Sequence, residues 1–290
     1  MMDHVSPPFR AHAYRSACGR LELFARDYGG DGPPLLLMHG LTRNSADFEP
    51  LVPHLVDAYR LVVPDQRGRG LSPNDPDPAN YRPDIYAQDM FALLDSLGIE
   101  QVGLVGTSMG GLMAMIMAAL QPDRIGAVVL NDVGPVLDPV GLARIGGYVG
   151  AAGPFASWQD AADRTAAING TAFPNFGDSD WLAFARRTCR EVEGGRVAFA
   201  YDPAIAAAFD SVPAEQPDLW PLWAMLADKP VLVLRGALSD LLAPDTVARM
   251  AKEHSGPFVA CDIPQRGHAP LLDEPEALAA ITSFLKRHRA

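Results

Sequence analysis

Short apolar runs alternate along this chain with segments of helical periodicity. Such runs predict buried strands, because a strand covered by helices on both faces needs no polar alternation. Ahead of them, residues 14–28 alternate with period two around Cys18-Gly19 and predict two antiparallel edge strands. Strands are then expected at 35–38, 61–64, 102–105, 127–130, 231–234 and 258–263, and helices at 46–55, 84–97, 111–120, 246–253 and 274–287. This order predicts an α/β fold with a mostly parallel eight-stranded sheet flanked by helices.

The rhythm stops between residues 135 and 226. No clear buried strand is found there, and the segment is rich in Ala, Trp, Phe and Pro. Breakers such as Gly153-Pro154 indicate several short helices. We therefore expect 135–226 to form a helical lid, inserted into a core made of 1–134 and 227–290.

The 290-residue chain is acidic, with a formal net charge of −11. Its field repels phosphates, which argues against nucleic-acid and anionic-membrane partners and leaves a small-molecule substrate as the expected partner. The first residues lack the basic and apolar regions of a secretory signal. Cys18, Cys189 and Cys261 are few and widely separated, as expected for free thiols in a reducing cytoplasm. A homodimer is compatible with the sequence, which fixes no oligomeric state.

A candidate nucleophile stands where the central strand turns into a helix. The turn reads Gly106-Thr107-Ser108-Met109-Gly110, and its glycines let strand and helix approach without Cβ clashes. Such a turn exposes the hydroxyl of Ser108 and points the amide of Met109 at the group under attack. A second amide is expected from Leu41, after the strand that ends in His39-Gly40.

A serine hydroxyl needs a base, and usually a carboxylate that orients the base. His268 lies between the last strand and the last helix, at the sheet edge where Ser108 also lies. For the acid we favour Asp240, which follows the strand at 231–234 and gives the chain order Ser, Asp, His. Asp132 ends an adjacent strand and is the rival. No metal-binding motif is present.

Together, these positions and the turn Asp65-x-Arg67-Gly68-x-Gly70-x-Ser72 make the chain resemble the α/β-hydrolase superfamily, specifically its capped serine hydrolases. We interpret that turn as a hydrogen-bonded brace for the loop at Leu41, and not as a nucleotide site. The resemblance covers nearly the whole chain. It implies hydrolysis of a carboxylic ester, thioester or lactone of small to medium size through an acyl-enzyme, with no cofactor.

Two other functions stay open beside the esterase hypothesis. One is hydrolysis of a carbon–carbon bond, as in the meta-cleavage hydrolases of this fold. The other is ligand binding by a member of the fold that lacks catalysis. For the esterase, the lid supplies aromatic side chains that are candidates for an apolar acyl pocket: Trp158, Phe173, Phe176, Trp181 and Tyr201.

Overall fold

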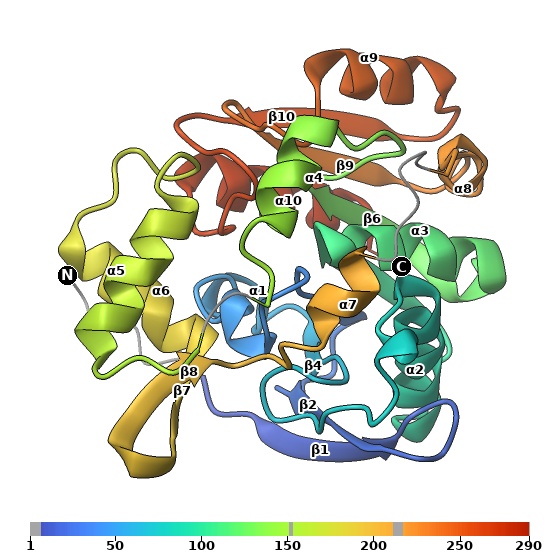
Figure 1. Ribbon diagram of the computed structural model, residues 1–290. Coiled ribbons are helices and arrows are strands. Elements are labelled where there is room, and N and C mark those ends of the chain that lie inside the picture. Colours follow the sequence, from blue (N-terminus) through green and yellow to red (C-terminus); the bar gives the residue numbers. More distant parts are fainter. Residues whose placement is uncertain (1–6, 151–152, 211–216, 290) are drawn as a thin grey trace.

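An eight-stranded sheet runs through the molecule and carries helices on both faces (Figure 1). The computed structural model describes residues 7–150, 153–210 and 217–289. The strands are β1 (Arg10–Arg15), β2 (Glu22–Asp27), β3 (Pro34–Met38), β4 (Arg60–Asp65), β5 (Val102–Thr107), β6 (Ile125–Asn131), β9 (Val231–Gly236) and β10 (Phe258–Ile263). Their order is β1-β2-β4-β3-β5-β6-β9-β10. β2 runs antiparallel to both of its neighbours, β1 and β4, and the other neighbouring strands are parallel. This confirms the mostly parallel sheet. β2 lies inside the sheet and not at an edge.

Alternate residues of each strand face opposite sides of the sheet and belong to two separate cores. On β3, for example, Leu36 and Met38 face one core, whereas Leu35 and Leu37 face the other. The helices of the core are α1 (Val52–Leu55), α2 (Pro83–Ser96), α3 (Met109–Leu120), α9 (Pro244–Glu253) and α10 (Pro275–Arg287). Residues of α2 and α3 pack on the first face, and residues of α1 and α10 pack on the second. Both faces of the sheet are thus covered by buried apolar side chains, as the continuous apolar runs predicted.

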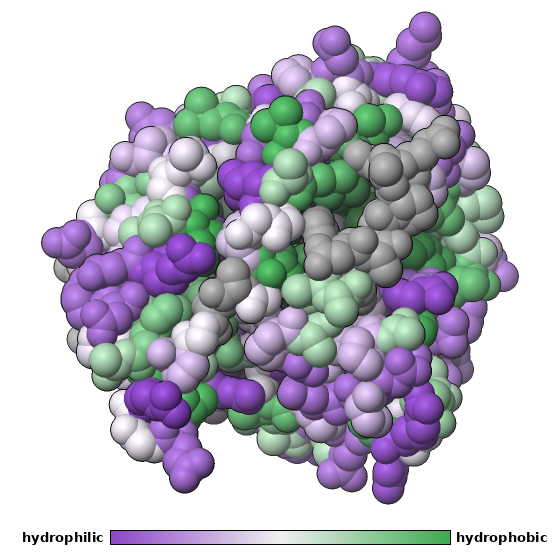
Figure 2. Space-filling view, in the orientation of Figure 1, coloured by the Kyte–Doolittle hydropathy of each residue, from purple (hydrophilic) through white to green (hydrophobic). Residues whose placement is uncertain are grey.

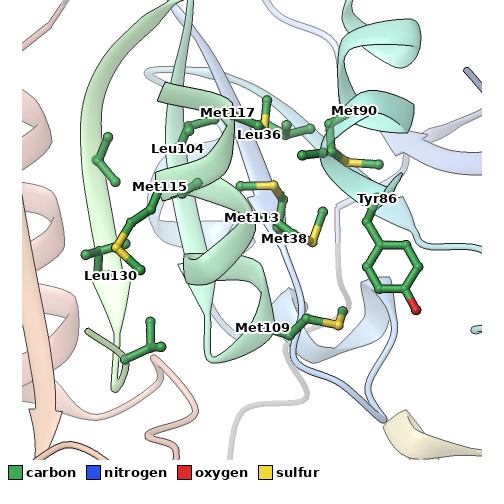
Figure 3. Close-up of a cluster of buried hydrophobic side chains, with 14 of the residues drawn as sticks. Leu36, Met38, Tyr86, Met90, Leu104, Met109, Met113, Met115, Met117 and Leu130 are labelled. Carbon is green, nitrogen blue, oxygen red and sulfur yellow. The ribbon is translucent and has the colours of Figure 1, made fainter. Parts of the chain in front are cut away.

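Helix α3, which follows Ser108, is buried almost all round. Its side chains Met109, Met113, Met115 and Met117 are buried, and Figure 3 shows them packed among Met38 and other residues of the sheet and α2. Burial of each methionine stabilises the fold by about 1.5–3 kcal/mol relative to exposure. The start of α3 is therefore a firm support for a reactive group.

The helix expected at 46–55 is broken in the structure. The segment forms a 3-10 turn, η1 (Ser45–Phe48), followed by the short α1. Pro50 lies between the two, and a proline within a helix removes a backbone donor and collides with the preceding turn. The apolar spacing still has its predicted effect, because Phe48 and Leu55 are buried. Short 3-10 turns also form at η2 (Pro78–Asn80) and η3 (Pro122–Arg124).

The segment between β6 and β9, here called the insert (residues 135–226), contains five described helices. They are α4 (Pro139–Gly146), α5 (Trp158–Asn169), α6 (Asp178–Thr188), α7 (Ile205–Asp210) and α8 (Trp220–Ala224). A hairpin of β7 (Cys189–Val192) and β8 (Arg196–Phe199), joined by η4 (Glu193–Gly195), is also present. Arg190 and Glu191 are exposed, so the hairpin lacks the apolar run that reveals a buried strand. The expectation of a purely helical insert was wrong in this respect.

The described surface is mixed in polarity. On the face shown in Figure 2, hydrophilic residues dominate the rim, and hydrophobic residues gather toward the middle. Among the described residues, none of the helices combines the length and the apolar character needed to cross a bilayer. The division into a core and a lid stays a prediction.

Candidate active site

Ser108 occupies the sharp turn between β5 and α3. Its φ of 52° and ψ of −115° lie outside the regions that non-glycine residues usually adopt. Glycines permit the close approach: a Cβ on Gly106 would collide with the carbonyl oxygen of Gly110, and one on Gly110 with that of Met38. The turn therefore holds the serine hydroxyl at the carboxyl edge of the sheet.

His268 contacts Ser108 from the loop after β10. Its Nε2 atom lies 2.8 Å from Ser108 Oγ, and its Nδ1 atom lies 2.8 Å from Asp132 Oδ2. Because a carboxylate only accepts hydrogen bonds, we assign the imidazole proton to Nδ1. Nε2 is then free to accept the proton of the serine hydroxyl. The three side chains form one hydrogen-bonded relay from three loops at the same edge of the sheet.

The carboxylate next to His268 is Asp132, so the preference for Asp240 was wrong. Asp132 follows β6, is fully buried, and also accepts hydrogen bonds from the Gly236 amide at 2.8 Å and the Ser239 hydroxyl at 2.7 Å. Its φ of 55° is a left-handed conformation that Asp tolerates better than most residues. This backbone turn brings its side chain to the imidazole.

Asp240 points instead to the insert. Its carboxylate receives two hydrogen bonds from Arg144 of α4, at 2.5 and 2.8 Å. These hydrogen bonds are the main reason that the pKa of Asp240 lies below its ordinary value. Asp240 thus stays ionised as the partner of a guanidinium. In this arrangement it connects the loop after β9 to the insert.

Two backbone amides remain unused beside the serine. Within the described part of the chain, the amides of Leu41 and Met109 donate to no protein acceptor. Met109 is the first residue of α3, whose N-terminus carries a partial positive charge. Leu41 follows Gly40, and a Cβ on Gly40 would lie 3.6 Å from Ser108 Cβ. The loop at Leu41 therefore runs directly along the serine, where a developing oxyanion needs donors.

His39 controls the orientation of that loop. Gln66 donates its amide proton to His39 Nε2 at 3.2 Å, so Nδ1 carries the proton and donates to the Gly40 carbonyl at 2.8 Å. Burial lowers the pKa of His39 to about 3 and keeps the imidazole neutral. Because the peptide unit is planar, fixing the Gly40 oxygen also fixes the direction of the Leu41 amide.

The turn after β4 braces the same loop. The Asp65 carboxylate accepts hydrogen bonds from the Ser45 amide at 2.6 Å and the Leu71 amide at 2.8 Å. In the same turn, Arg67 forms buried ion pairs with Asp75 and Asp89. These contacts fit the bracing role expected for the turn from Asp65 to Ser72.

A small cavity of about 40 Å³ opens at Ser108 and His268, and a second of about 20 Å³ adjoins it beneath the insert. Four residues line both: Thr42, Arg43, Tyr148 and Asn169. Tyr201 lines the second cavity, together with Phe184 and Phe199. Sequence patterns gave no signal for the latter two beyond their aromatic character.

The other predicted pocket aromatics pack on one another within the insert. Phe173 and Trp181 are buried, and Phe176 and Trp158 pack against the same cluster between α5 and α6. The ring centroids of Phe173 and Phe176 lie 4.8 Å apart. None of these four lines either cavity at Ser108. The structure thus places them in the insert's own core.

A parallel sheet covered on both faces, with a serine at the elbow of its central strand and a histidine after its last strand, defines the class of α/β hydrolases. The chain belongs to this family. Residues 33–275 match the sequence profile described as the alpha/beta hydrolase fold.

Two relatives that resemble it along almost their whole length are named as hydrolases. The chain is 33% identical to a 3-hydroxybutyrate-oligomer hydrolase of Cupriavidus necator, over 93% of this chain and 94% of that protein. It is 32% identical to a 2-(acetamidomethylene)succinate hydrolase of Mesorhizobium japonicum, over 92% of both chains. The crystal structure of an α/β hydrolase from Novosphingobium aromaticivorans superposes with a TM-score of 0.89. It shares 44% identity, covering 96% of this chain and 98% of the other.

Proposed function

We propose that this chain is a serine hydrolase that cleaves a carboxylic ester of a small to medium, partly apolar substrate through an acyl-enzyme. The observation that carries the proposal is the relay of Ser108, His268 and Asp132, with both contacts to the imidazole at 2.8 Å. A thioester or a lactone would serve as substrate by the same chemistry. The similarity to a 3-hydroxybutyrate-oligomer hydrolase supports an ester of a short acid.

In the proposed mechanism, His268 Nε2 removes the proton of Ser108 as the serine oxygen attacks the substrate carbonyl. The amides of Leu41 and Met109 stabilise the oxyanion. His268 then gives its proton to the departing alcohol, and the acyl group remains on Ser108. Water then attacks the acyl-enzyme and loses a proton to His268. His268 returns this proton to Ser108 Oγ as the acid leaves. Asp132 accepts the hydrogen bond from Nδ1–H of His268 and stabilises the imidazolium in each step.

Hydrolysis of p-nitrophenyl acetate and butyrate tests the proposal. Turnover is expected for the wild type, and Ser108→Ala should reduce kcat/KM by at least about a thousandfold, because no other nucleophile replaces the serine. Ser96→Ala is the matched control, since Ser96 bonds to the Leu93 carbonyl away from the site. Absence of turnover on a broad panel of esters would refute the proposal. If the chain hydrolysed no ester but turned over a vinylogous 1,5-diketone, hydrolysis of a carbon–carbon bond would be the favoured function.

A further inference from the structure

An ion pair that the relay does not use lines the cavity beside Ser108. Arg43 Nη1 donates to Asp47 Oδ1 at 2.7 Å, and the side chains are 15% and 8% exposed. Both residues line the cavity that contains Ser108 and His268. The stem of Arg43 passes close to the serine, because a Cβ on Gly40 would lie 3.8 Å from Arg43 Cγ and 3.6 Å from Ser108 Cβ.

This pair has hydrogen-bonding capacity left over. Within the described residues, Nε and Nη2 of Arg43 and Oδ2 of Asp47 have no hydrogen-bond partner among protein groups. None of the three atoms is sealed in the interior. Phe184 fixes the plane of the guanidinium, whose central carbon lies 4.2 Å from the ring centroid. The pair thus combines unused donors and an unused acceptor on two residues that line the cavity, and the contact with Phe184 lowers the entropic cost of using them.

The chemistry of the pair selects a neutral group that both donates and accepts. A carboxylate would be attracted by Arg43 but repelled by Asp47, and an ammonium group would meet the reverse. A hydroxyl accepts from a guanidinium and donates to a carboxylate at the same time. We propose that Arg43 and Asp47 bind a hydroxyl of the substrate, so that the preferred substrates are hydroxyacyl esters; this inference rests on the proposed function.

The strand order places this hydroxyl on the acyl side of the scissile bond. Ser108 follows β5, which lies between β3 and β6. His268 follows β10, beyond β6, and delivers the proton to the departing alcohol, so the alcohol lies on that side. Arg43 follows β3, on the opposite side of the serine. The side of Arg43 and Asp47 is therefore left for the oxyanion, which Leu41 of the same loop would bind, and for the acyl chain.

The test compares methyl butyrate with methyl 2-hydroxybutyrate and methyl 3-hydroxybutyrate, with acid release followed in a pH-stat. For the better hydroxylated ester, the wild type should show a kcat/KM about ten- to a hundredfold above that for methyl butyrate, as expected for hydrogen bonds to charged partners. Arg43→Met and Asp47→Ala should each bring this ratio to within about threefold of one. The control Glu49→Ala removes a carboxylate paired with Arg26, outside the cavity, and should leave the ratio unchanged.

Each other outcome has a defined meaning. A wild-type ratio near one, or a ratio that survives both substitutions, overturns the hydroxyl site. Preference for monomethyl succinate that Arg43→Met abolishes overturns it in favour of an anion site. If the wild type hydrolyses no ester, the proposed function fails, and calorimetry on Ser108→Ala then decides the hydroxyl site. Tighter binding of methyl 3-hydroxybutyrate than of methyl butyrate supports the site, and equal affinity overturns it.

Discussion

Replacing Asp132 by asparagine should remove most of the activity while leaving the fold in place. The Oδ2 atom of Asp132 accepts from both His268 Nδ1 and the Ser239 hydroxyl. The Oδ1 atom accepts from the Gly236 amide, which keeps the asparagine oxygen on that side. The new amide nitrogen then faces the imidazole and donates to it. His268 is therefore driven to the tautomer protonated on Nε2, which cannot accept the proton of Ser108.

A comparable change of tautomer in another serine hydrolase lowers kcat by about 10⁴-fold, equivalent to about 5.4 kcal/mol at 1.36 kcal/mol per decade. We expect a loss of that order for Asp132→Asn. The matched variant Asp240→Asn breaks only an ion pair whose side chains are 22% and 30% exposed. Such pairs contribute about 0–1 kcal/mol, so a change of at most about fivefold is expected.

Both variants are assayed with p-nitrophenyl butyrate, and thermal unfolding confirms that each is folded. The reasoning would be refuted if Asp240→Asn lost activity by thousands of times while Asp132→Asn kept most of it. That result would mean that Asp240 reaches the imidazole during turnover and that the contact at Asp132 is only structural.

Two further predictions concern stability. Asp89→Asn should lower the free energy of unfolding in urea by about 1–3 kcal/mol, because the buried guanidinium of Arg67 loses the charge behind two of its hydrogen bonds while its ion pair with Asp75 remains. The exposed pair of Asp84 provides the control, and an equal effect of Asp84→Asn would contradict this. His39, with its pKa of about 3 in the folded chain, should make stability depend on pH. Well above its ordinary pKa of about 6.5, neither state holds a proton on this imidazole. Below that value, the unfolded chain binds a proton that the folded chain excludes, so the free energy of unfolding falls by about 1.4 kcal/mol for each pH unit of acidification. Urea titrations at pH 6 and pH 5 should show this extra loss in the wild type but not in His39→Asn; equal slopes would count against it.

The contact between Ser108 and His268 could be predicted from the sequence because local signals place both residues, and their roles as nucleophile and base belong to the proposed function. The glycines around Ser108 permit the tight turn, and His268 follows the last strand, so the parallel topology brings the two to one edge of the sheet. The sheet and both dry faces are likewise encoded in the continuous apolar runs.

The choice of acid could not be made in the same way. Asp132 and Asp240 both follow strands that are neighbours in the sheet, so strand-end logic treats them alike. The difference arises from the left-handed backbone at Asp132 and from Arg144. Arg144 belongs to α4, which is far from Asp240 in the sequence, and donates two hydrogen bonds to its carboxylate. Neither is visible in apolar periodicity.

The insert limits prediction for a related reason. Phe173 and Phe184 are both phenylalanines of the same segment and cannot be told apart in the sequence, but only Phe184 lines a cavity near Ser108. Which aromatic faces the substrate depends on how α5 and α6 pack, and that packing is a tertiary property.

The position of the relay carboxylate directly after β6 separates the relay from the attachment of the insert. The loop after β9 donates hydrogen bonds to Asp132 from Gly236 and Ser239. The carboxylate of this loop, Asp240, pairs instead with Arg144 of α4. Mutations in α4 can therefore alter how the insert sits without touching any of the three relay side chains. Under that arrangement, we expect substitutions to change the shape of the cavity more readily than the hydrogen bonds among Ser108, His268 and Asp132.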